Sequence, residues 1–229
     1  MKLLGIESSC ERVSVAVLVD DQIRQHWVEG GPTPSDRLIP VVFDLLAEHG
    51  LTLAALDAIA LGVGPGAFTG LRLGCSVAQG FALAAGLGIV PVGSLDVIAA
   101  AQSATQVLVA TDARMGETYM AGYLRGDDGY TAVGNPACLP PEAVRLPGAG
   151  EWLGVGTGFD RYPDRLLAGE PRLHRAAAGL VPEAGALVRL AAASLRHAPA
   201  LSPEHVALHY VRDKVAQTVA ERLAQGGKA

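Results

Sequence analysis

The chain has 229 residues, enough for one large domain or two small ones. Half of its residues are hydrophobic, 18% are charged, and the formal net charge is −5. This composition excludes a disordered chain and disfavours a dedicated nucleic-acid binder, which usually has a basic face. The three cysteines are far apart and form no disulfide pattern, and no apolar run reaches membrane-spanning length. The sequence therefore predicts a cytoplasmic globular protein without a membrane segment.

The first part of the chain has the element order of a ribonuclease-H-like unit. Runs of β-branched residues joined by short polar links predict a three-stranded meander, after which helical and strand patterns alternate. The predicted strands are 2–6, 13–19, 23–28, 56–61 and 88–92, and the predicted helices are 35–49, 71–85 and 94–101. Ser35, Thr69 and Ser94 occupy the expected N-cap positions. Pro40 predicts an irregular first turn, or a later start, for the first helix.

The strand pattern begins again at Gln106. The predicted elements of this second part are strands 106–111, 117–124, 130–133 and 151–155, a short helix 163–167 and a helix 182–197. The connection 135–150 is rich in proline, which leaves little room for a long helix. We therefore expect an α/β protein made of two similar halves, 1–103 and 104–200, with the second abbreviated. The remaining segment, 201–229, is expected to pack back on the first half.

A glycine-dense turn joins the strand 56–61 to the helix 71–85. Such a turn lets the backbone approach another group closely, although the glycines of Gly62–Gly74 can also serve only to make a tight corner. In the helix that follows, Gly74, Ala78 and Ala82 recur every four residues, so one side carries almost no bulk. Such a stripe predicts close packing by another helix, either of this chain or of a partner.

The first predicted strand ends in a carboxylate and two small hydroxyl side chains. Glu7, Ser8 and Ser9, together with Thr69 at the glycine turn, are the candidates for holding a phosphate, as in a vestigial phosphate loop of an actin-like ATPase. The alternative is a β-hairpin with a capped polar turn. Arg12 would neutralise part of the negative charge that Mg²⁺ requires.

Two further clusters of polar residues are candidates for metal binding. His205 and His209 would face one another on a helix, but the surrounding sequence favours an extended segment, in which they would lie roughly 13 Å apart. Asp112 and Glu117 could hold a cation, but Arg114 between them favours an ion pair that fixes a hairpin. We expect no metal site and no catalytic residue.

Four separate segments resemble the TsaB (YeaZ) family. Gly64–Gly74 is similar to that family's GPGSFTGLRIG motif, and Asp112–Tyr119 to its DARMGEVY motif. Tyr210–Ala216 is similar to its C-terminal YLRNNVA motif, and Gly154–Gly158 matches a shorter piece. In contrast, Glu7–Cys10 is more similar to the corresponding motif of the paralogous TsaD family.

The resemblance implies an actin-like (ASKHA) fold and a role in forming N6-threonylcarbamoyladenosine at position 37 of tRNAs that read ANN codons. It further implies a non-catalytic partner that pairs with TsaD, is joined by the ATPase TsaE, forms a homodimer when alone, and meets tRNA only through the complex. No cofactor is then required, and ATP or ADP is expected only in the complex with TsaD. The alternatives are an actin-like ATP-dependent transferase, a glycoprotease-type metallopeptidase, and a nucleotide-binding module.

The pairing surface is expected on the helices 35–49 and 71–85, because the first is apolar on two sides and the second carries the small-residue stripe. The residues predicted to meet a partner are Leu38, Val42, Leu45, Arg72, Gly74, Cys75, Ala78 and Ala82.

Overall fold

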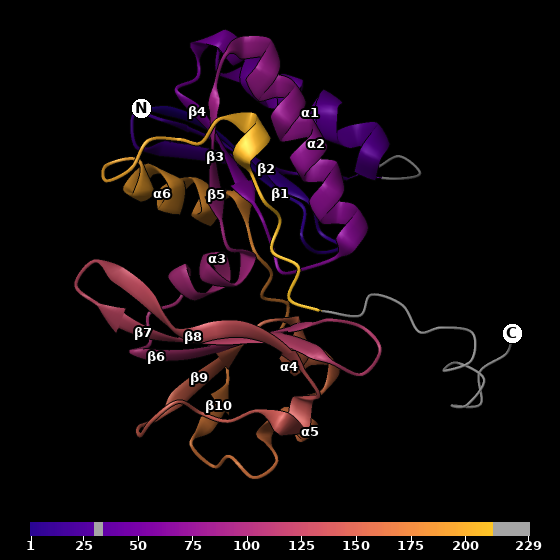
Figure 1. Cartoon of the computed structure of the whole chain (residues 1–229), viewed down its shortest axis with the longest axis vertical. Coiled ribbons are helices and arrows are strands. Elements are labelled where there is room, and N and C mark those ends of the chain that lie inside the picture. The colour runs from indigo at the N-terminus through magenta and orange to yellow at the C-terminus, as the bar shows by residue number, and fades with distance from the viewer. Residues whose placement is uncertain (30–33, 213–229) are drawn as a thin grey trace, which may run out of the picture.

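A computed structural model describes residues 1–29 and 34–212 of the chain, which form two halves, each built on a five-stranded sheet (Figure 1). The strands of the first sheet lie in the order β3-β2-β1-β4-β5. Strands β1 (Lys2–Glu7), β2 (Ser14–Val19) and β3 (Gln22–Trp27) form an antiparallel meander. On the other side of β1, strands β4 (Ala58–Gly62) and β5 (Gly88–Val92) extend the sheet and run parallel to β1. This is the order of the predicted ribonuclease-H-like half.

Both faces of the first sheet are covered by helices. Helices α1 (Pro34–Glu48) and α2 (Phe68–Ala85) pack on one face, where alternate strand residues such as Leu4 and Ile6 form the core. Helix α6 (Ala184–Ser194) packs on the other face, against Leu3. The strands are therefore buried on both sides, which explains their nearly continuous apolar sequences.

The second sheet has the order β10-β9-β6-β7-β8. Its strands are β6 (Gln106–Asp112), β7 (Thr118–Gly126), β8 (Gly129–Leu139), β9 (Trp152–Val155) and β10 (Leu173–Arg175). One face packs on α3 (Ser94–Ala100), and the other on the short helices α4 (Thr157–Arg161) and α5 (Pro163–Leu167). Three 3₁₀ turns, η1 (Leu53–Ala55), η2 (Pro141–Ala143) and η3 (Pro203–His205), complete the described elements.

The predicted boundaries between the halves need correction. Helix α6 lies within the predicted second half, 104–200, but it packs on the first sheet because its apolar face, which includes Leu187 and Val188, completes that core. Helix α3 lies within 1–103, yet it covers the second sheet. The chain thus crosses between the halves more often than a simple tandem duplication requires.

After α6 the chain remains on the first half before it reaches the cleft, as Figure 1 shows for the yellow segment. Leu201 and Ile89 exchange two backbone hydrogen bonds of 2.9 and 2.8 Å, and Gln79 of α2 donates to the carbonyl of Pro203 at 2.8 Å. We call residues 201–212 the strap. The rest of the predicted C-terminal segment, 213–229, lies outside the described residues.

The predicted helix starts were wrong in detail. Helix α2 begins at Phe68 with Ala67 at the N-cap position, so Thr69 lies inside the helix, and the Ala67 backbone N–H donates to the carbonyl of Ser9 at 2.6 Å. Helix α3 begins at Ser94 as predicted, but Gly93 and not Ser94 occupies its N-cap position. Helix α1 begins at Pro34 and continues through Pro40. Helix α4 and strand β10 were not predicted, and both are very short.

The predicted partner-binding residues also need correction, because nearly all of them are buried inside this chain. Those in the core between α1, α2 and the first sheet are Leu38, Val42, Leu45, Gly74, Cys75, Ala78 and Ala82. Arg72 alone of the predicted set is exposed. The small-residue stripe of α2 is therefore needed by the fold of the chain itself.

The β1–β2 turn explains why that stripe must be small. A Cβ atom at Gly70 would lie 2.1 Å from the carbonyl oxygen of Ser8, and one at Gly74 would lie 2.2 Å from its Oγ. Gly80, six residues after Gly74 on α2, differs: its outward side is open, with nothing within 4 Å of an added Cβ. Two glycines of one helix thus have opposite steric surroundings.

We predict opposite effects of the same substitution at these two glycines. Gly80→Ala should raise the free energy of unfolding by about 1 kcal/mol, because glycine is a poor helix former. Gly70→Ala should lower it by about 1–3 kcal/mol, because the Ser8 backbone must move. Urea denaturation of the two variants measures both changes, and a loss of stability in both would contradict the steric distinction.

Candidate functional site

A cavity of about 530 Å³ lies between the two halves. The first half contributes the β1–β2 turn and the glycine turn to its wall, and the second half contributes the β6–β7 turn. The strap closes a further side with residues 209–212. Ligand-binding sites occur preferentially in clefts between such units, so this cleft is the first candidate site.

The residues predicted to hold a phosphate are mostly turned away from this cavity. Glu7 is fully buried, and its carboxylate accepts hydrogen bonds from the Ser9 backbone N–H at 2.8 Å and from Ser94 Oγ at 3.1 Å. Ser8 Oγ donates to the Gly70 carbonyl at 2.8 Å. Burial raises the pKa of Glu7 above its ordinary value, although these hydrogen bonds oppose the shift.

This arrangement does not fit the phosphates of a nucleotide. The Ser9 carbonyl and the Ser8 carbonyl and hydroxyl occupy the space beside Gly66, Gly70 and Gly74, where a phosphate would need free N–H groups. Of the four predicted residues only Ser9 lines the cavity, and Thr69 is exposed on α2. Among the described residues that line the cavity, none is a lysine. The predicted phosphate loop is therefore corrected to a packed structural turn.

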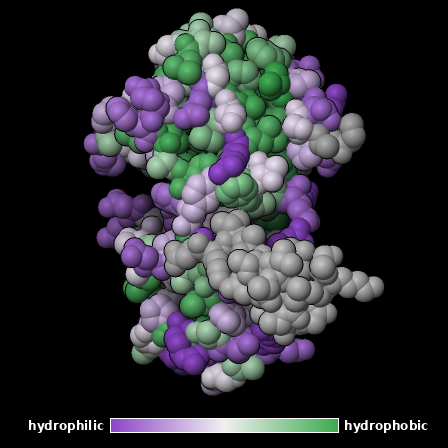
Figure 2. Space-filling model, turned by 45° about the vertical axis from the view of Figure 1, so that its right-hand side comes forward, coloured by the Kyte–Doolittle hydropathy of each residue, from purple (hydrophilic) through white to green (hydrophobic). Residues whose placement is uncertain are grey.

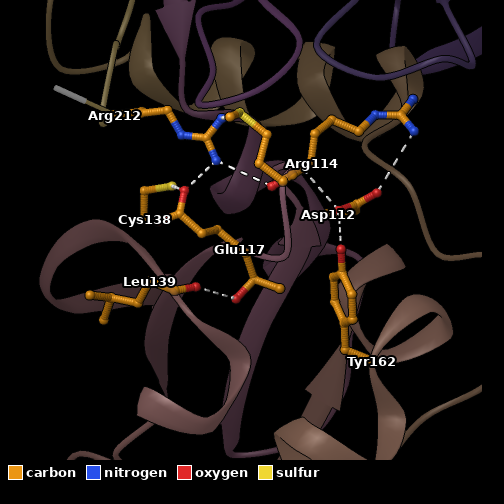
Figure 3. A network of polar contacts seen from close by, with 9 residues as sticks. Asp112, Arg114, Glu117, Cys138, Leu139, Tyr162 and Arg212 are labelled. Atoms are coloured by element: carbon orange, nitrogen blue, oxygen red, sulfur yellow. Dashed lines mark hydrogen bonds and ion pairs between the residues drawn. The ribbon is translucent and has the colours of Figure 1, made fainter. Parts of the chain in front are cut away.

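The β6–β7 turn forms the opposite wall and contains a network of ion pairs (Figure 3). Three consecutive residues, Arg114, Met115 and Gly116, have positive φ angles of 63°, 56° and 78°. Asp112 Oδ1 accepts from the Arg114 backbone N–H at 2.9 Å and from Tyr162 Oη at 3.3 Å. The Arg114 guanidinium forms an ion pair with Glu11 of the first half. Arg114 Nη1 also lies 4.0 Å from Asp112 Oδ2, so the expected ion pair within the hairpin is confirmed for Asp112 but not for Glu117.

Arg212 at the end of the strap holds the same turn from the other side. Its guanidinium pairs with Glu117 and donates to the Arg114 carbonyl at 3.2 Å, as Figure 3 shows. Asp112 and Glu117 therefore have different cationic partners. No group of three metal-ligating side chains occurs among residues 1–29 and 34–212.

The two histidines of the strap do not form a pair. His205 lies in η3 with its Nδ1 3.1 Å from Ser202 Oγ, whereas His209 lies in irregular backbone and donates its N–H to the Val63 carbonyl at 2.8 Å. The predicted extended conformation is wrong for His205, which lies in a 3₁₀ turn, whereas Val206 directly after it is extended and residues 207–212 belong to no helix or strand.

An exposed apolar surface on the outer sides of α1 and α2 is the second candidate site, and Figure 2 shows hydrophobic residues gathered on this side of the first half. On α1, Ile39 and Phe43 are 43% and 47% exposed, and on α2 Leu83 is 70% exposed. Exposed residues recur every four positions along α2: Phe68, Arg72, Ser76, Gly80 and Ala84. We call this row the outer stripe.

The sequence also contains the outer stripe, but its small residues Ser76, Gly80 and Ala84 have the same spacing as the inner row Gly74, Ala78 and Ala82, which drew the prediction. A groove of about 490 Å³ continues the apolar surface at the ends of both helices, where it is lined by Phe43, Ala47 and Ala84 among others. Contiguous exposed apolar surface of this kind is typical of protein–protein contact sites. None of the helices in the described parts of the chain is both long and apolar enough to cross a bilayer.

Comparison with known proteins identifies the family. Over 225 residues, covering 94% of this chain and 96% of the relative, the chain is 36% identical to the tRNA threonylcarbamoyladenosine biosynthesis protein TsaB of Escherichia coli strain K12. The chain belongs to the TsaB (YeaZ) family. A second TsaB, from Haemophilus influenzae, is 34% identical over 71% of this chain and 74% of its own.

A solved structure and a family model agree with the TsaB assignment. YeaZ from Pseudomonas aeruginosa superposes with a TM-score of 0.83 at 36% identity, covering 91% of this chain and 99% of its own. The family model described as TsaD, tRNA N6-adenosine threonylcarbamoyltransferase, matches residues 22–154. The TsaB chain thus has the actin-like (ASKHA) fold and is related in sequence to the transferase family.

We predict that Glu7 makes the stability of this TsaB chain depend on pH. Because its pKa is raised in the folded state, the folded protein binds the proton more tightly than the unfolded chain, whose pKa is near 4.5. The protonated Glu7 carboxyl therefore stabilises the folded protein at low pH, and this contribution is lost as pH rises through the folded-state pKa of Glu7. Glu7→Gln should make the protein more stable than the wild type at pH 8, by a margin that shrinks toward pH 5.

Urea denaturation between pH 5 and pH 8 measures this margin. Glu29→Gln, at an exposed position of the same half, is the control and should leave the profile unchanged. A Glu7→Gln variant that is less stable than the wild type at every pH would contradict the prediction.

Proposed function

We propose that this TsaB-family chain is a non-catalytic partner of a TsaD-type transferase in the formation of N6-threonylcarbamoyladenosine at position 37 of ANN-decoding tRNAs. The established role of the related TsaB proteins in tRNA threonylcarbamoyladenosine biosynthesis, and the match to the TsaD family model, support the pathway. The chain itself contributes a pairing surface, the outer faces of α1 and α2. The observation that carries this proposal is the outer stripe.

Gly80 is the most informative residue of that stripe. A glycine inside a helix costs about 1 kcal/mol relative to alanine, and the open space around Gly80 shows that the fold of this chain does not require it. A glycine next to Ser76 and Ala84 does, however, let a second helix approach closely. Exposed Phe43 and Leu83 on either side would then be buried in the contact.

The proposal places no nucleotide site in the isolated chain, because the Glu7–Ser9 turn is packed against α2. ATP or ADP would bind only where this chain and the TsaD-type partner meet, and TsaE would join that complex. Two copies of the chain would pair through the same surface when the partner is absent, so the two assemblies would compete. tRNA would be contacted through the complex. The transferase, metallopeptidase and nucleotide-binding alternatives gain no supporting observation from the described residues.

Substitutions on the pairing surface, one on the outer stripe and one beside it, should separate pairing from folding. We expect Gly80→Gln and Leu83→Glu to weaken binding of the TsaD-type partner at least 30-fold, because both put bulk or charge into a close helix contact, while the isolated variants stay folded. Isothermal titration calorimetry with the purified partner measures the affinity. Modified adenosine in tRNA from the reconstituted enzyme set should fall in parallel.

Leu124→Glu is the matched control, since Leu124 is also an exposed leucine, 41% accessible, but lies on β7 of the second half. It should bind the partner like the wild type. If Gly80→Gln and Leu83→Glu both bind the partner with wild-type affinity, or if Leu124→Glu weakens binding as much as they do, the pairing surface is not on α1 and α2.

A further inference from the structure

Arg72 is held in one position on the outer stripe by two aromatic side chains. Its guanidinium carbon lies 3.7 Å from the centroid of the Phe68 ring, and its Nε donates to Tyr210 Oη at 3.3 Å. The rings of Phe68 and Tyr210 are themselves 5.5 Å apart. Arg72, Phe68 one turn earlier on α2 and Tyr210 of the strap thus form a single surface cluster.

The fold of the isolated chain gives no reason for this cluster. Phe68 and Tyr210 are 38% and 48% exposed, although burial of aromatic rings would stabilise the protein. Arg72 lies near the N-terminus of α2, where a positive charge opposes the helix dipole. Among the described residues no carboxylate forms an ion pair with it, and its only polar partner there is the Tyr210 hydroxyl.

The stacked geometry leaves the outer end of the guanidinium available. Nε is used by Tyr210 and one face is covered by Phe68, but neither Nη atom donates a hydrogen bond within the described parts of the chain. Two parallel N–H groups are suited to a carboxylate, which accepts both. Because stacking already restricts the side chain, little further conformational entropy is lost on binding.

We propose that Arg72 receives a carboxylate from the pairing helix of the TsaD-type partner in a two-pronged ion pair, an inference that rests on the pairing surface proposed above. Charge complementarity decides the partner group: the exposed cation lies at one end of a stripe that is otherwise apolar or small. Arginine and tyrosine clusters of this kind contribute disproportionately to protein–protein affinity.

The position of the carboxylate follows from the helix geometry. Arg72 precedes Gly80 by eight residues, which is about 12 Å along the axis of α2. On a partner helix packed lengthwise along the outer stripe, the Asp or Glu lies about two turns from the residue that contacts Gly80. This spacing identifies which partner residues are candidates for a charge exchange.

The experiment measures partner affinity by calorimetry for the full chain carrying Arg72→Gln, Arg72→Lys or Arg72→Glu. We expect about 30-fold weaker binding for Arg72→Gln, an intermediate loss for Arg72→Lys, and the largest loss for Arg72→Glu. Wild-type affinity should fall with added salt more steeply than that of Arg72→Gln. A partner variant with Asp or Glu changed to Arg at the specified spacing should restore binding to Arg72→Glu.

Arg24→Glu on β3 is the charge control, because Arg24 is exposed and has no carboxylate partner among the described residues. It should bind within about twofold of the wild type. Circular dichroism should show all Arg72 variants folded, since a carboxylate near a helix N-terminus is favourable.

Three results would overturn the inference. Wild-type affinity of Arg72→Glu, together with lost binding of Leu83→Glu, would remove the role of Arg72 and leave the pairing proposal intact. Equal losses for Arg24→Glu and Arg72→Glu would show only a long-range charge effect. Weakened self-association of Arg72→Glu in sedimentation, with unchanged affinity for the TsaD-type partner, would assign the contact to a second copy of this chain.

Discussion

The close approach of the β1–β2 turn to α2 is the constraint on which the rest of the structure depends. The Ser8 carbonyl and hydroxyl fill the space that side chains at Gly70 and Gly74 would need, and Ser9 binds the N–H of Ala67 at the start of the helix. These contacts fix the rotation of α2 about its own axis. That rotation puts Ala78 into the core and leaves Gly80 on the surface, so a contact near the helix start determines which residues a partner can reach.

The same contact links the two candidate sites. The Glu7–Ser9 turn packs against α2, and the walls of the cleft are joined across the two halves by the Arg114–Glu11 ion pair. The strap runs between the cleft and the pairing surface: Tyr210 stacks beside Phe68 of α2, and two residues later Arg212 holds the β6–β7 turn. A partner that engages the outer stripe therefore touches an element that also shapes the cleft.

Periodicity predicted most strands and helices, because alternating and four-residue patterns are local properties of the sequence. The small residues alone do not show how α2 is rotated, since that helix has two such rows, Gly74-Ala78-Ala82 and Ser76-Gly80-Ala84, and the contact of the inner row with the distant Ser8 has no local signal. Helix α6 was assigned to the wrong half because its apolar face does not specify a sheet. The Arg212–Glu117 pair joins residues 95 positions apart and has no local signal.

We infer that this chain binds its TsaD-type partner through the outer faces of α1 and α2 and not through the cleft. Hydrogen exchange followed by mass spectrometry, with and without the TsaD-type partner, tests it most directly. Relative to the chain alone, measured at a concentration low enough to keep it monomeric, we expect slower exchange in α1 and α2 on complex formation, with β6 and β7 unchanged. Slower exchange confined to the cleft walls and the second half, with α1 and α2 unaffected, would contradict it.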